Sequence, residues 1–135
     1  MVIDSSALIA LLLGEPETAD FVSAIAAAST RLVGAPSYLE TAIVMLARSG
    51  PGAQESVDRL LGELSVEIIP FTHDQAVIAI AAYRQYGKGS GHPAGLNFGD
   101  CFTYALAKLT GEPVLFKGND FSRTDLAIAA AGESR

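Results

Sequence analysis

Short apolar segments alternate with longer amphipathic ones along almost the whole chain. Segments rich in aliphatic and β-branched residues predict strands beginning at Val2 and at 31–35, 66–71 and 113–116. The longer segments place apolar side chains three or four positions apart, which predicts helices at 7–13, from 16 to about 28, and at 36–49, 53–64, 73–86 and 98–110. This alternation predicts an α/β three-layer sandwich, with a mainly parallel central sheet of four or five strands and helices on both faces.

Glycine and proline mark the boundaries between these segments. The stretch 50–52 (GPG) breaks one helix, and Gly111 ends another. The stretch 87–95 (GKGSGHPAG) is the one clear loop, and its composition predicts flexibility. Repeats and interdomain linkers are absent from the sequence, so we expect a single domain over 1–135, with disorder only at 132–135.

Composition narrows the class of protein. Half of the 135 residues are hydrophobic, which is enough for a real core. The single cysteine, Cys101, excludes an intramolecular disulfide and a cysteine-based zinc site, and we expect it in the core. The longest apolar run, 7–13, is far short of the roughly 20 residues that span a bilayer, and no basic stretch precedes it. These features predict a cytoplasmic protein without a membrane segment.

The net charge of −6 by itself argues against a nucleic-acid-binding protein, because phosphate contacts need lysine and arginine. The uneven distribution of charged residues along the chain weakens this argument. Only three of the nine basic residues lie before residue 84, together with ten of the fifteen acidic ones. The C-terminal part is therefore locally basic if its aspartates bind metal, although scatter over a solvated surface explains the pattern equally well.

Four acidic residues are placed where the chain should reach one edge of the sheet. Asp4 ends the first strand, and Asp120 follows the fourth strand by a short turn. Glu40 and Asp100 fall in the predicted first turns of two helices. Because ligand sites of open parallel sheets form beyond the carboxyl ends of the strands, we expect these four carboxylates to converge.

Converging carboxylates repel one another and require a cation. A set of oxygen ligands favours Mg²⁺ or Mn²⁺ over zinc, and neither histidine is placed like a zinc ligand. Such an ion activates water and stabilises charge on a phosphodiester during hydrolysis, and Ser6 is positioned to orient a water or a carboxylate. Each acid also has an ordinary structural explanation: Asp4 as a helix cap, Glu40 and Asp100 as first-turn acids, and Asp120 as a turn residue.

At this point the chain resembles a known family. The segments VIDSSA at 2–7, SYLE at 37–40, LNFGDCFTYALA at 96–107 and LFKGNDF at 115–121 are similar, in order and spacing, to a PIN domain of the VapC type. VapC proteins are the toxins of VapBC toxin–antitoxin systems. The resemblance covers nearly the whole chain, and the segments around Asp100 and Asp120 are its most specific parts.

The resemblance implies a Mg²⁺-dependent endoribonuclease in which Mn²⁺ can substitute, with Asp4, Glu40, Asp100 and Asp120 at the family's acidic positions. It implies a supporting role for Ser6 and leaves open whether Asp120 or the nearby Asp125 binds metal directly. It also implies a homodimer and a small antitoxin whose basic C-terminal segment occupies the active-site groove, in a heterotetramer or larger assembly.

A basic rim around the predicted site is the expected contact surface for RNA or antitoxin. Its members are Arg84, Lys88, His92, Lys117 and Arg123. His92 is equally a polar loop residue, and Asp125 equally a helix cap. Tyr38 and Tyr104 are candidates for stacking on a base, but their helical stripe positions favour the core. The apolar stripes at 7–13 and 38–46 are either core or a dimer interface.

Two other classes of protein share parts of this pattern. A receiver domain also has an aspartate pocket, Mg²⁺ and a late lysine, which Lys117 imitates, but it needs an acidic pair after the first strand and an aspartate after the middle one. A haloacid-dehalogenase-type phosphatase needs a second aspartate at position 6, which is a serine here. A PIN fold that only binds metal and a partner, without catalysis, is the remaining alternative.

Overall fold

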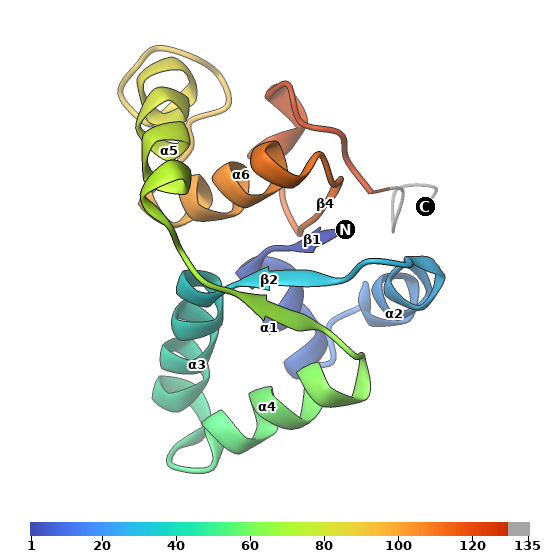
Figure 1. Cartoon of the computed structure of the whole chain (residues 1–135). Coiled ribbons are helices and arrows are strands. Elements are labelled where there is room, and N and C mark those ends of the chain that lie inside the picture. Colours follow the sequence, from blue (N-terminus) through green and yellow to red (C-terminus); the bar gives the residue numbers. More distant parts are fainter. Residues whose placement is uncertain (130–135) are drawn as a thin grey trace.

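The computed structural model describes residues 1–129, which form a parallel four-stranded sheet in the order β3-β2-β1-β4 (Figure 1). The strands are β1 (Val2–Ile3), β2 (Leu32–Gly34), β3 (Glu67–Ile69) and β4 (Val114–Leu115). Each pair of neighbours is parallel, with Val2 paired with Leu32 on one side and with Val114 on the other. The predicted α/β class with a parallel sheet is confirmed, with four strands.

Six helices cover the two faces of this sheet. They are α1 (Ser5–Leu12), α2 (Thr18–Ala27), α3 (Ala35–Ser49), α4 (Ala53–Glu63), α5 (His73–Tyr86) and α6 (Phe98–Thr110). Figure 1 shows α5 and α6 on one side of the strands and α1 to α4 on the other. The arrangement confirms the predicted three layers.

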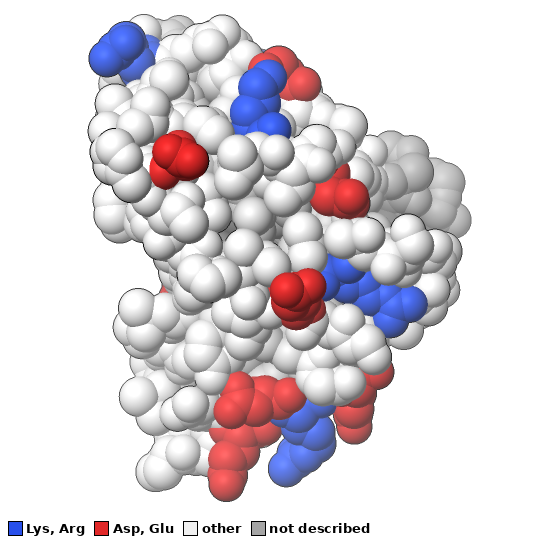
Figure 2. Space-filling view, viewed as in Figure 1, with Lys and Arg blue, Asp and Glu red and all other residues white. Residues whose placement is uncertain are grey.

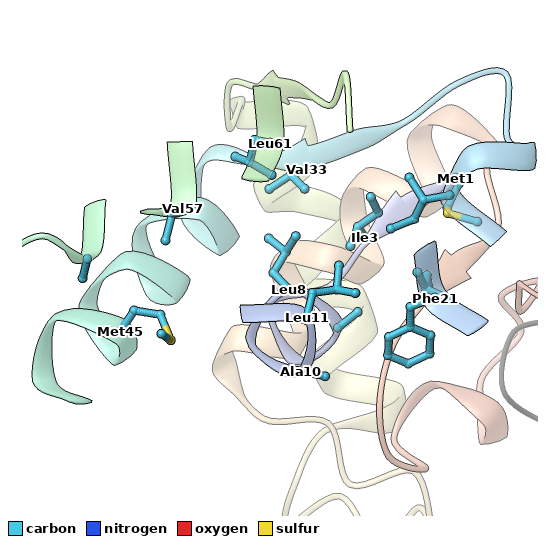
Figure 3. Close-up of a cluster of buried hydrophobic side chains, with 14 residues drawn as sticks. Met1, Ile3, Leu8, Ala10, Leu11, Phe21, Val33, Met45, Val57 and Leu61 are labelled. Atoms are coloured by element: carbon cyan, nitrogen blue, oxygen red, sulfur yellow. The ribbon is translucent and has the colours of Figure 1, made fainter. Parts of the chain in front are cut away.

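The hydrophobic core is divided by the sheet into two clusters. Ile3, Val33 and Leu115 face the α1 to α4 side, where Leu8, Phe21, Val57 and their neighbours fill the space (Figure 3). Their sequence neighbours Val2, Leu32 and Val114 face α5 and α6 instead. Successive strand residues point to opposite faces, so strands buried on both sides are apolar at every position.

The structure shortens the predicted strands for local reasons. Residues 66–71 reduce to β3 (Glu67–Ile69), because Pro70 has no backbone N–H to donate. Residues 31–35 reduce to β2, because α3 begins directly at Ala35 with Pro36 in its first turn. The expected disorder at 132–135 lies outside the described residues. Within 1–129, none of the helices is long and apolar enough to cross a membrane.

The loop 87–95 is pinned at its base. The backbone N–H of Lys88 donates to the carbonyl of Leu96, and the N–H of Leu96 donates to the carbonyl of Tyr86. A parallel bridge between Gly87 and Leu96 closes the two ends. The loop therefore starts α6 from a defined position, and this brings the N-terminus of α6 to the same edge as the ends of β1, β2 and β4.

A candidate metal-binding active site at the carboxyl edge of the sheet

Asp4 is the first buried acid at this edge and has two structural partners. It is 4% exposed and occupies the N-cap of α1, where its Oδ2 accepts a hydrogen bond from the N–H of Ser6 at 3.0 Å. Its Oδ1 accepts from the hydroxyl of Thr103 at 2.6 Å. The helix-cap interpretation of Asp4 is therefore correct, but it accounts for only one of its two oxygens.

Asp100 is the second buried acid, at 8% exposure, and it belongs to a capping box with Asn97. The N–H of Asp100 donates to Asn97, and the N–H of Asn97 donates to Oδ2 of Asp100 at 3.0 Å. The pKa of Asp100 is raised to about 7, first by burial and also by the nearby carboxylates of Asp120 and Asp4, while the backbone hydrogen bond at Asn97 opposes the shift. Asp100 thus stabilises its own helix and also lies within the field of two other acids.

Glu40 approaches from α3; the residue as a whole is exposed, but its carboxyl group is partly desolvated. It lies beyond the first turn of α3, which contains no acid, so the first-turn explanation for Glu40 is wrong. The hydroxyl of Ser5 donates to its Oε1 at 3.2 Å. The pKa of Glu40 is raised, first by burial and then by the charge of Asp4, while the hydrogen bond from Ser5 opposes the shift. Glu40 is therefore electrostatically linked to Asp4.

Asp120 lies in the turn after β4 and is exposed. It precedes the short 3-10 helix η1 (Phe121–Arg123) but makes no side-chain capping hydrogen bond. Its carboxylate instead interacts with that of Asp100. Buried Phe121 packs edge-on against Phe116, with ring centroids 5.1 Å apart, and so anchors the turn to the sheet.

The structure therefore links the four predicted acids in pairs: Asp100 with both Asp4 and Asp120, and Asp4 with Glu40. In the part of the chain that is described, no group of three or more acidic, histidine or cysteine side chains is arranged so that it could hold a metal ion as it stands. The donor chemistry nevertheless fits a hard divalent cation, because every available ligand is a carboxylate oxygen and the charged form of Asp100 is disfavoured without a counter-ion. Exposed Glu40 and Asp120 are the members that are free to adjust.

Ser6 contacts a carboxylate through its backbone N–H, while its hydroxyl has a second partner. Its hydroxyl accepts a hydrogen bond from the backbone N–H of Lys117 at 2.9 Å, and its own N–H holds Asp4. Ser6 therefore joins the start of α1 to the turn that carries Asp120. Its effect on the site is to hold two of the acidic segments together.

Asp125 is engaged elsewhere. The hydroxyl of Tyr104 donates to one of its oxygens at 2.6 Å, and the ammonium of Lys108 donates to the other at 2.5 Å. Burial alone would raise the pKa of Asp125, but these two partners outweigh it and lower the pKa. The structure does not bring Asp125 into the carboxylate group, and buried Tyr104 is a core residue rather than a free base-stacking surface.

The predicted basic rim is only partly available. Lys117 pairs with Glu15 at 2.7 Å and with Glu17 at 3.3 Å, and His92 packs edge-on against Tyr86 while accepting from the N–H of Ala94. Arg84, Lys88 and Arg123 are exposed. Figure 2 shows basic side chains in small separate spots on the viewed face, while acidic ones gather near α4.

Three residues beside the acids were not predicted from the sequence to belong to the site: Thr103, Ser37 and Gly99, the last of which lies against the Glu40 carboxylate. Thr103 is a buried hydroxyl that contacts Asp4, and Ser37 contacts Thr103. A signal for Thr103 was present, because it follows Asp100 by three positions and so shares its helix face. Cys101, by contrast, is buried as predicted.

Comparison with known proteins places this geometry in a family. Residues 1–126 match the PIN domain model. The chain is 53% identical over 131 residues to Ribonuclease VapC30 of Mycobacterium tuberculosis, covering 96% of this chain and 98% of that protein. Ribonuclease VapC28 of the same species is 48% identical over 129 residues, covering 96% of this chain and 97% of that protein. The chain belongs to the PIN-domain family and, within it, to the VapC ribonucleases.

Solved structures agree at the level of the fold. Mycobacterium tuberculosis VapC20, a Sarcin-Ricin loop cleaving toxin, superposes with a TM-score of 0.74 at 17% identity, covering 93% of this chain and 95% of that one. A toxin-antitoxin complex from Klebsiella pneumoniae gives a TM-score of 0.67 at 20% identity, with 92% of each chain covered. The three-layer arrangement is thus shared with these solved structures, while the PIN-domain match over residues 1–126 is what favours this family over the receiver and phosphatase alternatives.

Proposed function

We propose that this protein is the toxin of a type II toxin–antitoxin system and that it hydrolyses RNA phosphodiester bonds with a divalent metal ion. The observation that carries the proposal is the pairing of two buried carboxylates, Asp4 and Asp100, at the carboxyl edge of a VapC-type PIN domain. Burying two like charges near one another is costly unless a cation neutralises them or one of them takes up a proton. The ribonuclease names of relatives at 43–53% identity support the same reaction.

Asp4 and Asp100 would hold the ion, and Glu40 and Asp120 would complete its ligands from the rim. Mg²⁺ is the expected ion, with Mn²⁺ as a substitute, because both prefer oxygen ligands. When bound, the ion supplies an activated water and stabilises charge on the phosphodiester. The protein's own contribution is orientation: the Ser6 N–H and the Thr103 hydroxyl hold Asp4, and the capping box holds Asp100.

The expected partner is a small antitoxin with a basic C-terminal segment. The chain carries six more negative than positive charges, and the exposed Glu40 and Asp120 lie at the same edge of the sheet as the two buried acids. A basic segment laid across that edge would neutralise these charges and exclude RNA from the site. Exposed Arg84, Lys88 and Arg123 remain the proposed contacts for RNA phosphates.

A homodimer is the expected state of the toxin, and α3 offers the surface for it. The apolar side chains at 7–13 belong to the hydrophobic core, because Leu8 and Leu11 of α1 are buried. The stripe at 38–46 leaves Leu39, Ile43 and Leu46 more than half exposed. A hollow of about 410 Å³ beside Leu39 and Ile43 continues at Phe98 and Phe102 into one of about 590 Å³ against α5. Apolar surface of this extent on a small domain is typical of an interface.

Cleavage of total cellular RNA by the purified, antitoxin-free protein tests the proposal. Discrete fragments that require both Mg²⁺ and an intact Asp4 would support a specific endoribonuclease, and their ends would identify the target. Asp4→Asn is the control for contaminating nucleases, and a chelator is the control for the ion. Cleavage no greater than that of Asp4→Asn, from folded protein that binds metal, would favour the non-catalytic PIN-fold alternative.

A further inference from the structure

A chain of buried hydroxyl groups leads to Asp4 from two other elements. The Thr103 hydroxyl, on α6, lies 2.6 Å from Oδ1 of Asp4, and the Ser37 hydroxyl, at the start of α3, lies 3.3 Å from that of Thr103. Ser37 and Thr103 are each 2% exposed, so water does not compete for these groups. The chain thus connects the end of β1, the first turn of α3 and the middle of α6.

The direction of this chain follows from the number of protons. An ionised carboxylate only accepts hydrogen bonds, and a threonine hydroxyl has one proton to give. Because Thr103 gives its proton to Asp4, its oxygen can only accept from Ser37. Ser37 therefore donates to Thr103 and Thr103 to Asp4, an order in which each hydrogen bond strengthens the next.

The contact made by Thr103 differs from that of other helical threonines in this protein. A threonine inside a helix commonly donates to a carbonyl of the preceding turn. Thr41 donates to the carbonyl of Ser37 at 2.7 Å, and Thr110 donates to that of Leu106 at 2.8 Å. Thr103 instead donates to a carboxylate 99 positions away in the chain. Its hydroxyl serves the site rather than its own helix.

We infer that Thr103, supported by Ser37, is a positioning residue that orients Asp4 toward the metal ion. The inference rests on the proposed function, since it assigns a role within the same site. Oδ2 of Asp4 is held by the Ser6 N–H and Oδ1 by Thr103, so the carboxylate is fixed at both oxygens. Each oxygen keeps a lone pair for a cation. Groups that orient metal ligands in this way typically contribute 10- to 100-fold in metal affinity or activity.

Titration calorimetry of Mn²⁺ into the metal-free protein tests this directly, with Mg²⁺-dependent RNA cleavage as a second readout. Thr103→Val keeps the volume and removes the hydroxyl, and it should weaken Mn²⁺ binding by roughly 10- to 100-fold. Thr103→Ser restores the hydroxyl and should restore the affinity. Ser37→Ala removes only the outer hydroxyl and should cause a smaller loss in the same direction. Thr41→Val is the matched control, a buried threonine on α3 whose hydroxyl donates to a backbone carbonyl.

The outcomes separate this inference from the proposed function. Wild-type affinity in Thr103→Val, no recovery in Thr103→Ser, or an equal loss in Thr41→Val would each overturn the positioning role alone. If Thr103→Val does not fold, the comparison of Ser37→Ala with Thr41→Val decides the matter in the same way. A wild-type protein that binds no Mn²⁺, or that binds it as well after Asp4→Asn, would overturn the metal site and the inference together.

Discussion

Oε1 of Glu40 lies 3.0 Å from the position that a Cβ atom would take on Gly99, and Oε2 lies 3.3 Å from it. A side chain at residue 99 would crowd the Glu40 carboxylate, which would have to shift by a few tenths of an ångström to make room in the first turn of α6. This contact brings an acid from α3 against the helix that carries Asp100. It also predicts an unusual effect for a glycine-to-alanine substitution.

Gly99→Ala should lower cleavage while leaving the thermal stability unchanged or raised. Alanine favours helix over glycine by up to about 1 kcal/mol, and the atom it displaces is the mobile end of an exposed side chain. The substitution should therefore displace the Glu40 carboxylate rather than destabilise the fold. Melting temperature and cleavage rate measured on the same preparation check this. Gly62→Ala in α4, where nothing lies within 4 Å, is the control and should not change cleavage. A parallel fall in stability and cleavage would show that Gly99 is needed for folding instead.

The metal-free protein should lose stability as the pH rises from about 4 to about 7. The pKa of Asp100 is about 7 in the folded state against an ordinary value of 3.8, so the folded state binds more protons across this interval. The free energy of unfolding therefore falls as Asp100 loses its proton, by an amount on the order of a few kcal/mol. Urea unfolding midpoints, determined at several pH values in the presence of a chelator, measure this loss of stability.

Asp100→Asn should remove most of this dependence, because asparagine does not titrate. Glu63→Gln is a charge-matched control at an exposed position of α4 and should retain it. A slope that persists unchanged in Asp100→Asn would mean that another group is responsible for the pH dependence.

Mg²⁺ should raise the melting temperature of the wild-type protein by mass action. At a concentration 100 times the dissociation constant the stabilisation is about 2.7 kcal/mol, or on the order of 5–10 °C for a domain of this size. Asp4→Asn should show a smaller shift, because it lacks one of the proposed ligands. Differential scanning fluorimetry over a range of Mg²⁺ concentrations measures both, and equal shifts in the two proteins would count against a metal site at Asp4.

Tyr104→Phe should destabilise the protein without altering its response to metal. The substitution removes a 2.6 Å hydrogen bond to Asp125, and a hydrogen bond to a charged group contributes about 1.5–3 kcal/mol. Asp125 lies outside the group of linked acids, so Mn²⁺ affinity should stay at the wild-type level. Tyr83→Phe, which loses an exposed hydrogen bond to the Lys88 carbonyl, is the control and should cost less. Weakened Mn²⁺ binding in Tyr104→Phe would restore the supporting role first expected of Asp125.

Ile43→Arg should convert a toxin homodimer to a monomer. Ile43 is 56% exposed in the isolated chain, so arginine can be accommodated there without disturbing the core. A charge inside an apolar interface is costly when it is desolvated. Light scattering after size-exclusion chromatography measures the mass. Leu109→Arg, at the far end of α6 and 51% exposed, is the control. A dimer that survives Ile43→Arg would place the interface on another face.

The class of fold and the positions of the acids could be predicted from the sequence. Strand segments that alternate with helices predicted a mainly parallel sheet with helices on both faces, and parallel strands direct their carboxyl ends to one edge. That reasoning was enough to place Asp4 and Asp120 correctly relative to the strands. The motif around Asp100 then indicated the family, which the PIN domain match over residues 1–126 confirms.

What the tertiary structure alone decided is which groups touch these acids. Thr103 contacts Asp4 across 99 positions of sequence, and Glu40 fits against Gly99 across 59, and no local pattern encodes pairings at such a range. The same holds for the residues withdrawn from the site. Asp125 is held by Tyr104, and Lys117 by Glu15, because the folded chain brings loop residues within reach of partners that are distant in sequence. Residue type and spacing determine which chemistry is possible at the sheet edge, while the distances set by packing determine which side chains take part in it.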